Sequence, residues 1–222
     1  MGGRAAGWKA AELILTELGR SQATGMSAEE EKDLLHVVKT MNHNIRSLAM
    51  ENEEFYGMAS TLSLICFSEK DAFVLHLGDT RIYRMYTPEG QTAQQSESEL
   101  QGYNVLQQLT TDWNLLNYWK TLPEYAHFGD EELMRDKKWN KLISYIGMNP
   151  DKLEAEVQIQ KNIPRNGMFI LTSDGIHDFV DEHEMIAILQ QELPMQDKIE
   201  LLMKLAVDNG SKDDQSIIIA EY

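Results

Sequence analysis

The sequence predicts an α+β fold in which helices flank a layered sandwich of mostly antiparallel strands. Two observations lead to this prediction: the N-terminal part of the chain and residues 183–207 show apolar residues at helical spacing, and the stretch between them shows short strand-like runs separated by turn residues. Helices before and after a run of strands are typical of layered α+β proteins. The 222 residues, 42% of them hydrophobic, are enough to bury a full core. We therefore expect a single domain over residues 1–222.

Two long amphipathic helices are expected near the N-terminus. Residues 5–18 place apolar side chains on one face, and Gly19 is expected to end that helix. The second helix is expected to begin at Ser27, because Ser-Ala-Glu-Glu has the pattern of a capping box. Apolar residues then continue at three- and four-residue spacing as far as Leu48. The two helices are expected to form one layer.

The middle and the C-terminal part of the chain alternate between strand and helix patterns. Tight turns at 69–71 and 78–80 predict that the first three strands form an antiparallel meander, and a turn at 164–167 joins the next two. The stretch 113–147 is rich in aromatic and charged residues and is interpreted as helical or irregular. Strands are predicted at 61–67, 72–77, 81–86, 157–161, 168–172 and 216–220, the last of them buried, and helices at 183–191 and 195–207.

Composition and charge exclude several classes of protein. The sequence contains no stretch of 18 or more apolar residues, so it predicts no membrane-spanning helix, and the N-terminus lacks the features of a secretory signal. The net charge of −16 argues against binding to a nucleic-acid backbone, which needs clustered Lys and Arg. The only cysteine, Cys66, cannot form an internal disulfide, as expected in a reducing compartment. We expect a cytoplasmic protein that binds neither nucleic acid nor membranes.

Three aspartates stand at or near the ends of predicted strands, beside small or turn-forming residues. Asp174 follows an apolar strand and precedes Gly175, Asp213 precedes the last strand, and Asp112 follows the meander. Oxygen ligands on rigid supports suit a hard divalent cation. The competing interpretation is ordinary turn chemistry, since Asp and Gly both favour turns. The single cysteine and the histidine spacing offer no zinc-type alternative.

Six short motifs, in order along the whole chain, resemble those of the metal-dependent protein phosphatase 2C (PPM) family, particularly its bacterial serine/threonine phosphatases. Each motif alone is weak, whereas six in the right order make a strong signal. They are Met-Gly-Gly-Arg-Ala-Ala-Gly (1–7), Gly-Met-Ala-Ser-Thr-Leu (57–62), His-Leu-Gly-Asp-Thr-Arg-Ile-Tyr (76–83), Leu-Thr-Thr-Asp (109–112), Leu-Thr-Ser-Asp-Gly-Ile-His-Asp (171–178) and Gly-Ser-Lys-Asp-Asp-Gln-Ser-Ile-Ile-Ile (210–219).

The resemblance implies two antiparallel β-sheets flanked by helices, with manganese or magnesium held by aspartates at one end. It implies that a metal-activated water hydrolyses phosphoserine and phosphothreonine in protein substrates, which a partner kinase would phosphorylate. Asp174 and Asp213 match core metal ligands, and Asp112 matches an aspartate that holds an additional, weaker metal together with Asp174. Arg4 could contact the substrate phosphate. His177 could act as an acid, although an exposed histidine at a helix start is the simpler interpretation.

The sequence also departs from the family pattern at its start. The first metal motif of the family is Asp-Gly-Met-Gly-Gly, and this chain begins at the methionine of that motif. The resemblance therefore implies that the bridging aspartate and the first strands of the sheets are missing, and that the domain is N-terminally incomplete. One explanation is a truncated reading of a longer phosphatase. The alternative is a catalytically silent pseudophosphatase that acts as a phosphoprotein-binding or regulatory module.

Residues 135–141, Arg-Asp-Lys-Lys-Trp-Asn-Lys, form a basic patch in this acidic chain. A solvated helix face is the simpler interpretation of this pattern. The alternative is that the patch steers an anionic phosphopeptide.

Overall fold

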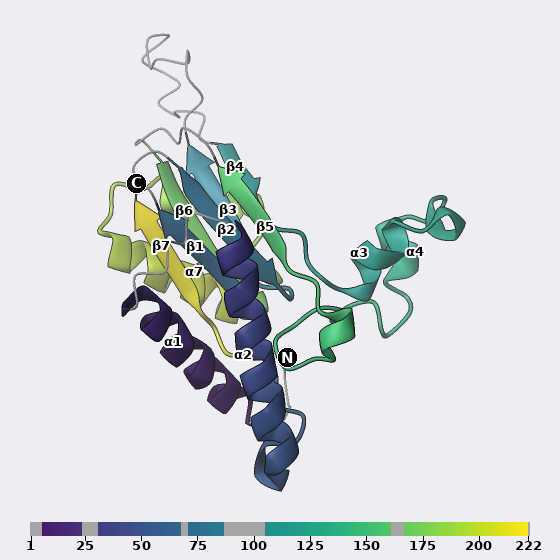
Figure 1. The fold of residues 1–222 in the computed structure, drawn as a ribbon. Coiled ribbons are helices and arrows are strands. Elements are labelled where there is room, and N and C mark those ends of the chain that lie inside the picture. Colours follow the sequence, from purple (N-terminus) through teal and green to yellow (C-terminus); the bar gives the residue numbers. More distant parts are fainter. Residues whose placement is uncertain (1–5, 24–30, 68–70, 87–104, 161–166, 222) are drawn as a thin grey trace, which may run out of the picture. The chain divides into compact units, whose positions relative to one another are not determined.

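The computed structural model describes residues 6–23, 31–67, 71–86, 105–160 and 167–221 (Figure 1). The chain divides into two compact units. Unit 1 comprises Met1–Thr80 and Thr111–Ile163, and unit 2 comprises Arg81–Thr110 and Pro164–Tyr222. Each unit contains one antiparallel sheet together with helices, so the predicted α+β fold with two antiparallel sheets is confirmed. The single domain over residues 1–222 stays a prediction.

Unit 1 is built on a three-stranded antiparallel sheet in the order β1-β2-β5. Two long helices, α1 and α2, contact each other and share a core with this sheet, formed by side chains such as Ile14, Met41, Ile45 and Leu75. The elements of this unit are α1 (Gly7–Ala23), α2 (Glu31–Glu51), η1 (Glu53–Phe55), β1 (Leu62–Phe67), β2 (Ala72–Leu77), α3 (Leu115–Lys120), η2 (Pro123–Tyr125), α4 (Asp130–Leu133), η3 (Pro150–Lys152) and β5 (Glu156–Gln160).

Unit 2 is built on a four-stranded antiparallel sheet in the order β4-β3-β6-β7. Alternate residues of the strands, among them Tyr83 and Ile170, pack against the helices through Ile176, Met185 and Leu202. The elements of this unit are β3 (Arg81–Tyr86), β4 (Val105–Gln108), β6 (Gly167–Thr172), α5 (Asp174–His177), α6 (Glu182–Leu189), α7 (Met195–Asp208) and β7 (Ile217–Glu221).

The predicted strands exist, but the predicted meander is wrong. β1 and β2 form an antiparallel pair, whereas β2 and β3 belong to different sheets even though a short turn joins them. β5 and β6 also belong to different sheets, and residues 164–166 of the turn expected between them lie outside the described residues. Alternating hydrophobicity identifies a strand and its buried face but does not specify which strand lies beside it.

The first helix is longer than expected. Gly19 does not end α1, which continues to Ala23, because an exposed glycine lowers helix stability without preventing a helix. The capping box expected at residues 27–30 lies outside the described residues. A capping box is present in α6 instead: the Asp181 carboxylate accepts from the Glu184 N–H, and the Glu184 carboxylate accepts from the Asp181 N–H.

The last strand is not buried as expected. β7 is an edge strand of its sheet, and Ile218 remains 61% exposed. Ile217 and Ile219, on the opposite face, pack into the core of unit 2. Three consecutive isoleucines predict a strand with both faces buried. In the structure, only the face that carries Ile217 and Ile219 packs against the core. None of the helices in the described ranges is long and apolar enough to cross a bilayer.

His76, in β2, is fully buried and gives the folded protein a pH-dependent stability. Its Nδ1 lies 3.0 Å from the Ser63 hydroxyl. Burial lowers the pKa of His76 from 6.5, and the nearby Glu156 and Asp112 carboxylates and the backbone of Thr111 and Gly78 oppose this lowering. The unfolded chain therefore binds more protons than the folded chain below pH 6.5, so stability is lost as the pH falls from 6.5 towards the folded-state pKa.

We expect urea unfolding to show this loss, with a contribution from His76 of at most about 1.4 kcal/mol per pH unit, the limit for one proton. A His76→Gln variant cannot titrate at this position and should lose less stability between pH 7 and pH 5 than the wild type. An identical pH dependence in the two proteins would contradict the assignment.

Candidate active site

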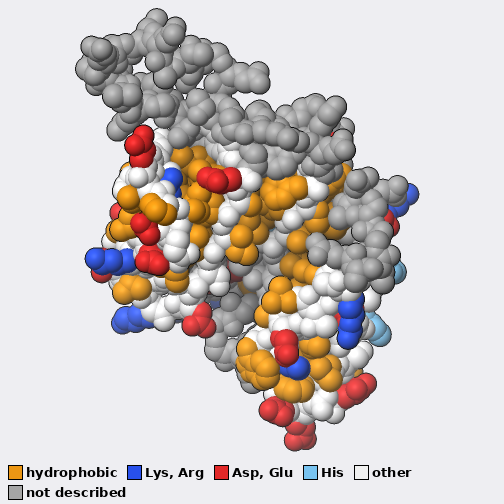
Figure 2. Space-filling view, turned by 90° about the vertical axis from the view of Figure 1, so that its left-hand side faces the viewer, with side chains coloured by type: hydrophobic (Ala, Val, Ile, Leu, Met, Phe, Trp, Pro, Cys, Tyr) orange, Lys and Arg blue, Asp and Glu red, His pale blue; other side chains and the backbone are white. Residues whose placement is uncertain are grey.

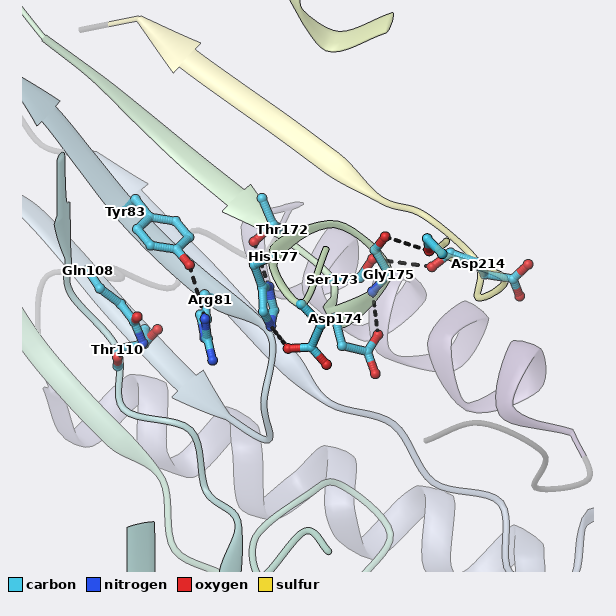
Figure 3. A network of polar contacts seen from close by, with 12 residues as sticks. Arg81, Tyr83, Gln108, Thr110, Thr172, Ser173, Asp174, Gly175, His177 and Asp214 are labelled. Carbon is cyan, nitrogen blue, oxygen red and sulfur yellow. Dashed lines mark hydrogen bonds and ion pairs between the residues drawn. The ribbon is translucent and has the colours of Figure 1, made fainter. Parts of the chain in front are cut away.

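The turn between β6 and α5 presents Asp174 at the carboxyl end of a buried strand, as the sequence predicts (Figure 3). Phe169 and Ile170 in β6 are buried, and Asp174 is the first residue of α5. One carboxylate oxygen of Asp174, Oδ1, accepts a hydrogen bond of 2.9 Å from the Gly175 N–H. The Ser173 N–H donates to the Ser216 carbonyl at 3.0 Å. The backbone on both sides of Asp174 is therefore fixed.

A second loop, which precedes β7, is tied to this turn by the Ser173 side chain. The Ser173 hydroxyl donates to the Asp214 carbonyl at 3.3 Å and accepts from the Ser216 N–H at 2.9 Å. In the same loop, Asp213 Oδ1 accepts from the Asp214 N–H at 2.8 Å. In Figure 3 the Asp214 side chain points away from Asp174. Two aspartate-bearing loops of unit 2, far apart in sequence, are therefore held together.

Gly175 allows this close approach because it has no side chain. A Cβ atom at this position would lie 2.5 Å from the Asp214 carbonyl oxygen, which is closer than real Cβ contacts. The buried Ser211 hydroxyl, from the segment that leads into the same loop, donates to the Gly175 carbonyl at 2.8 Å. The contact between the two loops thus depends on a glycine and on two serines, Ser173 and Ser211, that bond to backbone groups.

The carboxylates in these loops have the donor chemistry of a hard-cation site. Asp174 is partly exposed and Asp213 is exposed, and neither forms an ion pair with a described basic residue. Each has one oxygen, Oδ1, engaged with a neighbouring N–H, while Oδ2 has no hydrogen-bond partner among the described residues. Within the described ranges, however, no three His, Cys, Asp or Glu side chains form a group that could hold a metal ion. Carboxylate oxygens are the type of ligand that Mn²⁺ and Mg²⁺ prefer. Two carboxylates do not complete the coordination of such an ion, which takes further oxygen ligands, commonly waters.

His177 is buried rather than exposed, so the interpretation as an exposed histidine at a helix start is wrong. Its Nδ1 lies 2.9 Å from the Thr172 hydroxyl at the end of β6, and its Nε2 lies 3.9 Å from a carboxylate oxygen of Asp178. These contacts join the two ends of the turn that carries Asp174 (Figure 3). Its role as an acid stays a prediction.

Asp112 belongs to unit 1, in the loop that precedes α3, and is buried. The loop is fixed by its backbone: the Trp113 N–H donates to the Gly78 carbonyl at 2.7 Å, and the Asn114 N–H and the Asn117 side chain donate to the Asp112 carbonyl. The shared metal site with Asp174, which belongs to unit 2, stays a prediction. Arg4, the candidate for phosphate binding, lies outside the described residues.

Sequence reasoning missed the positioning roles of Ser173 and Ser211. Both are visible in the sequence as small hydroxyl residues next to or near a candidate aspartate, in Ser-Asp-Gly and Gly-Ser-Lys-Asp. The hydrogen bond of Ser173 to Asp214 joins residues 41 positions apart in the sequence, and that of Ser211 to Gly175 joins residues 36 positions apart. A local pattern cannot show such partners.

Comparison with known proteins identifies relatives along almost the whole chain. A "protein phosphatase 2C-type" of Streptococcus pyogenes serotype M6 is 25% identical over 222 residues, which cover 99% of this chain and 81% of the relative. The protein phosphatase PhpP of Streptococcus pneumoniae serotype 2 is 26% identical over 223 residues, covering 99% of this chain and 81% of the relative. No family model matches the chain.

Solved structures show the same fold. The serine/threonine phosphatase Stp1 from Staphylococcus aureus superposes with a TM-score of 0.80 at 25% identity, covering all of this chain and 80% of that one. The catalytic domain of the serine/threonine protein phosphatase PstP, solved in complex with two manganese ions, superposes with a TM-score of 0.70 at 22% identity, covering all of this chain and 84% of that one. In its fold, its ordered motifs and its sequence, the chain is therefore similar along almost its whole length to bacterial serine/threonine phosphatases of the phosphatase 2C type, which supports a protein serine/threonine phosphatase.

Proposed function

We propose that this chain hydrolyses phosphoserine and phosphothreonine in proteins with the help of a divalent cation, Mn²⁺ or Mg²⁺, held by Asp174 and Asp213. The observation that carries the proposal is that two carboxylates without a described basic partner stand on loops that Ser173 ties together. The name of the related PstP structure, which includes two manganese ions, supports a divalent cation of this kind.

A dication bound there would lower the pKa of a coordinated water and neutralise charge on the phosphoryl oxygens. The residues of the chain hold and orient the ligands. The Gly175 N–H donates to Oδ1 of Asp174, and the Asp214 N–H donates to Oδ1 of Asp213. Because each donor is a backbone group, these bonds hold the carboxylates, and therefore also their Oδ2 atoms, in a fixed orientation. Preset ligands reduce the rearrangement needed when the ion and the substrate bind.

In the proposed reaction the oxygen of a water molecule forms a bond to phosphorus while the bond from phosphorus to the serine or threonine oxygen breaks. The leaving oxygen takes a proton, so the products are inorganic phosphate and the unmodified side chain. No covalent intermediate on the protein is needed, and Cys66, the only thiol, stands in β1 with a pKa raised by burial, so it is not an activated nucleophile.

The substrate is proposed to be a phosphoprotein modified by a partner kinase. A cytoplasmic location is proposed as well, because a chain with one cysteine has no internal disulfide to form and is suited to a reducing compartment.

The neighbouring residues Asp213 and Asp214 provide a matched test. Only Asp213 is a proposed ligand, whereas the Asp214 side chain points away from Asp174 (Figure 3). We expect Asp213→Asn to lower manganese-dependent hydrolysis of a phosphothreonine peptide by at least about 100-fold, because loss of an outer partner of a metal ligand already costs 10–100-fold. Asp214→Asn should retain activity within about threefold. Equal losses in the two variants would show that the loop, not the Asp213 carboxylate, matters.

A silent phosphoprotein-binding module is the second candidate. It is favoured by one observation, that the described residues supply no group of three metal-ligating side chains. A folded wild-type protein that binds the phosphopeptide, and that releases no phosphate with either Mn²⁺ or Mg²⁺, would support this candidate over the enzyme.

A further inference from the structure

Exposed apolar side chains occur in several places on the surface, and Figure 2 shows one face where they lie among acidic and basic ones. Trp8 and Leu15 on α1, for example, are 68% and 70% exposed. Nothing in the structure indicates what would cover them. The basic patch at residues 135–141 forms turns rather than a helix and belongs to unit 1, whereas Asp174 belongs to unit 2. The buried surroundings of Asp174 are more informative than the surface.

The helix that begins at Asp174, α5, is a single turn of four residues. A helix this short is not stable in isolation, because few hydrogen bonds offset the cost of fixing its backbone. Contacts with the rest of unit 2 therefore hold it in place. The Ile176 side chain is fully buried in the core of the unit, and the Ser211 hydroxyl donates to the Gly175 carbonyl at 2.8 Å.

His177 links α5 back to β6, the strand that leads into Asp174. Its Nδ1 shares a hydrogen bond of 2.9 Å with the Thr172 hydroxyl, five positions earlier in the chain (Figure 3). Thr172 is a firm anchor, because β6 is an inner strand: Thr172 stands opposite Arg81 of β3 on one side and Ile217 of β7 on the other. The bond between the two side chains thus closes a short loop that contains Asp174.

Both partners of this hydrogen bond are shielded from water. Thr172 is 3% exposed, and the side chain of His177 is 2% exposed. When one partner of a buried hydrogen bond is removed, the other stays unsatisfied, because water does not reach it. Removal of the Thr172 hydroxyl is therefore expected to release His177 from the strand and to loosen the turn.

The same burial argues against a direct contact between His177 and a substrate. A general acid must come within hydrogen-bond distance of the leaving oxygen. The second ring nitrogen of His177, Nε2, is enclosed with the rest of the side chain and lies 3.9 Å from a carboxylate oxygen of the half-exposed Asp178. This geometry favours a role of His177 through its neighbours in the protein.

We propose that His177 is a positioning residue, whose hydrogen bond with Thr172 keeps the Asp174 carboxylate in the orientation that binds the divalent cation. The inference rests on the proposed phosphatase function, because it concerns the same site. The Gly175 N–H orients the Asp174 carboxylate relative to α5. The bond between His177 and Thr172 orients α5 relative to β6. Loss of an outer partner of a metal ligand costs about 10–100-fold in metal affinity or activity, and a comparable effect is expected here.

Thr172→Val and Thr172→Ser are a matched pair of variants, because both side chains fit a strand and only serine keeps the hydroxyl. We expect Thr172→Val to raise the Mn²⁺ dissociation constant at least about tenfold, and Thr172→Ser to stay within about threefold of the wild type. Equal dissociation constants in the two variants would overturn the role assigned to the hydrogen bond.

A comparison of two substrates separates positioning from acid catalysis. The leaving oxygen of a phosphothreonine peptide needs a proton, whereas p-nitrophenolate leaves p-nitrophenyl phosphate without one. We expect Thr172→Val and His177→Leu to lower the hydrolysis of both substrates by the same factor. A loss confined to the peptide would overturn the proposal and identify His177 as the acid. His183→Leu, at an exposed position on α6 of the same unit, is the control and should keep wild-type rates.

Amide hydrogen exchange of Gly175, measured by NMR in the metal-free protein, tests the proposal without any hydrolysis. The Gly175 N–H donates to Asp174, so its exchange rate reports the order of the turn. We expect this rate to be at least about tenfold higher in Thr172→Val than in Thr172→Ser, because a buried hydrogen bond is lost. Equal rates overturn the proposal. A wild type that hydrolyses no substrate contradicts the proposed function separately, and the exchange rates still decide whether His177 positions the turn.

Discussion

Replacement of Asp174 by asparagine is expected to reduce manganese-dependent hydrolysis of a phosphothreonine peptide by at least about 100-fold. Asparagine has the same shape as aspartate, and its side-chain oxygen can still accept the hydrogen bond from the Gly175 N–H. The fold should therefore survive, while the negative charge that attracts the cation is lost. Initial rates at saturating Mn²⁺, together with an unfolding curve, measure the two effects separately.

Asp208→Asn is the matched control for this change. Asp208 is the exposed last residue of α7 in the same unit, and its side chain has no hydrogen bond or ion pair with another described residue. The Asp208→Asn variant should keep wild-type activity. Because it removes one negative charge, as Asp174→Asn does, it shows whether the loss of charge alone lowers activity. An Asp174→Asn protein that keeps more than about a tenth of wild-type activity would contradict the assignment of Asp174 as a ligand.

A methyl group added at Gly175 is expected to damage both stability and activity. Alanine is normally the better helix former, but at this position its Cβ would lie 2.5 Å from the Asp214 carbonyl oxygen. The loop that carries Asp213 must move, and overpacking of this kind costs about 1–3 kcal/mol of unfolding free energy. A displacement of about 1 Å at a site can lower activity by about 100-fold. Urea unfolding and initial rates of Gly175→Ala test both expectations.

Gly19→Ala is the control, because Gly19 is also helical and has no atom within 4 Å of an added Cβ. This change should raise the unfolding free energy by about 0.5–1 kcal/mol and leave activity unchanged. If Gly175→Ala were as stable and as active as Gly19→Ala, the close contact between the two loops would not matter for the site.

The sequence predicted the elements of the fold much better than their arrangement. The strands predicted at 72–77 and 81–86 have the same bounds in the structure, because alternating or continuous apolar runs between turn residues are strong local signals. Their assignment to different sheets was missed. β4 was missed altogether, since its four residues, Val-Leu-Gln-Gln, are too short and too polar to show a pattern.

The candidate site was predicted in part for a similar reason. Asp174 and Asp213 could be found because each stands beside a strand within a recognisable motif, and the structure ties their loops together. The burial of His177 was missed, because it depends on contacts with Thr172 and the surrounding core rather than on its immediate neighbours. The roles of Asp112 and Arg4 remain predictions, since one belongs to the other unit and one lies outside the described residues.

Direct measurement of manganese binding tests the central claim, that Asp174 and Asp213 hold a divalent cation. The electron paramagnetic resonance signal of free Mn²⁺ can be followed as wild-type, Asp174→Asn, Asp213→Asn and Asp208→Asn proteins are titrated. We expect saturable binding in the wild type and the Asp208→Asn control, and a dissociation constant at least about tenfold higher in each of the other two variants. Equal affinity in all four proteins would contradict the claim.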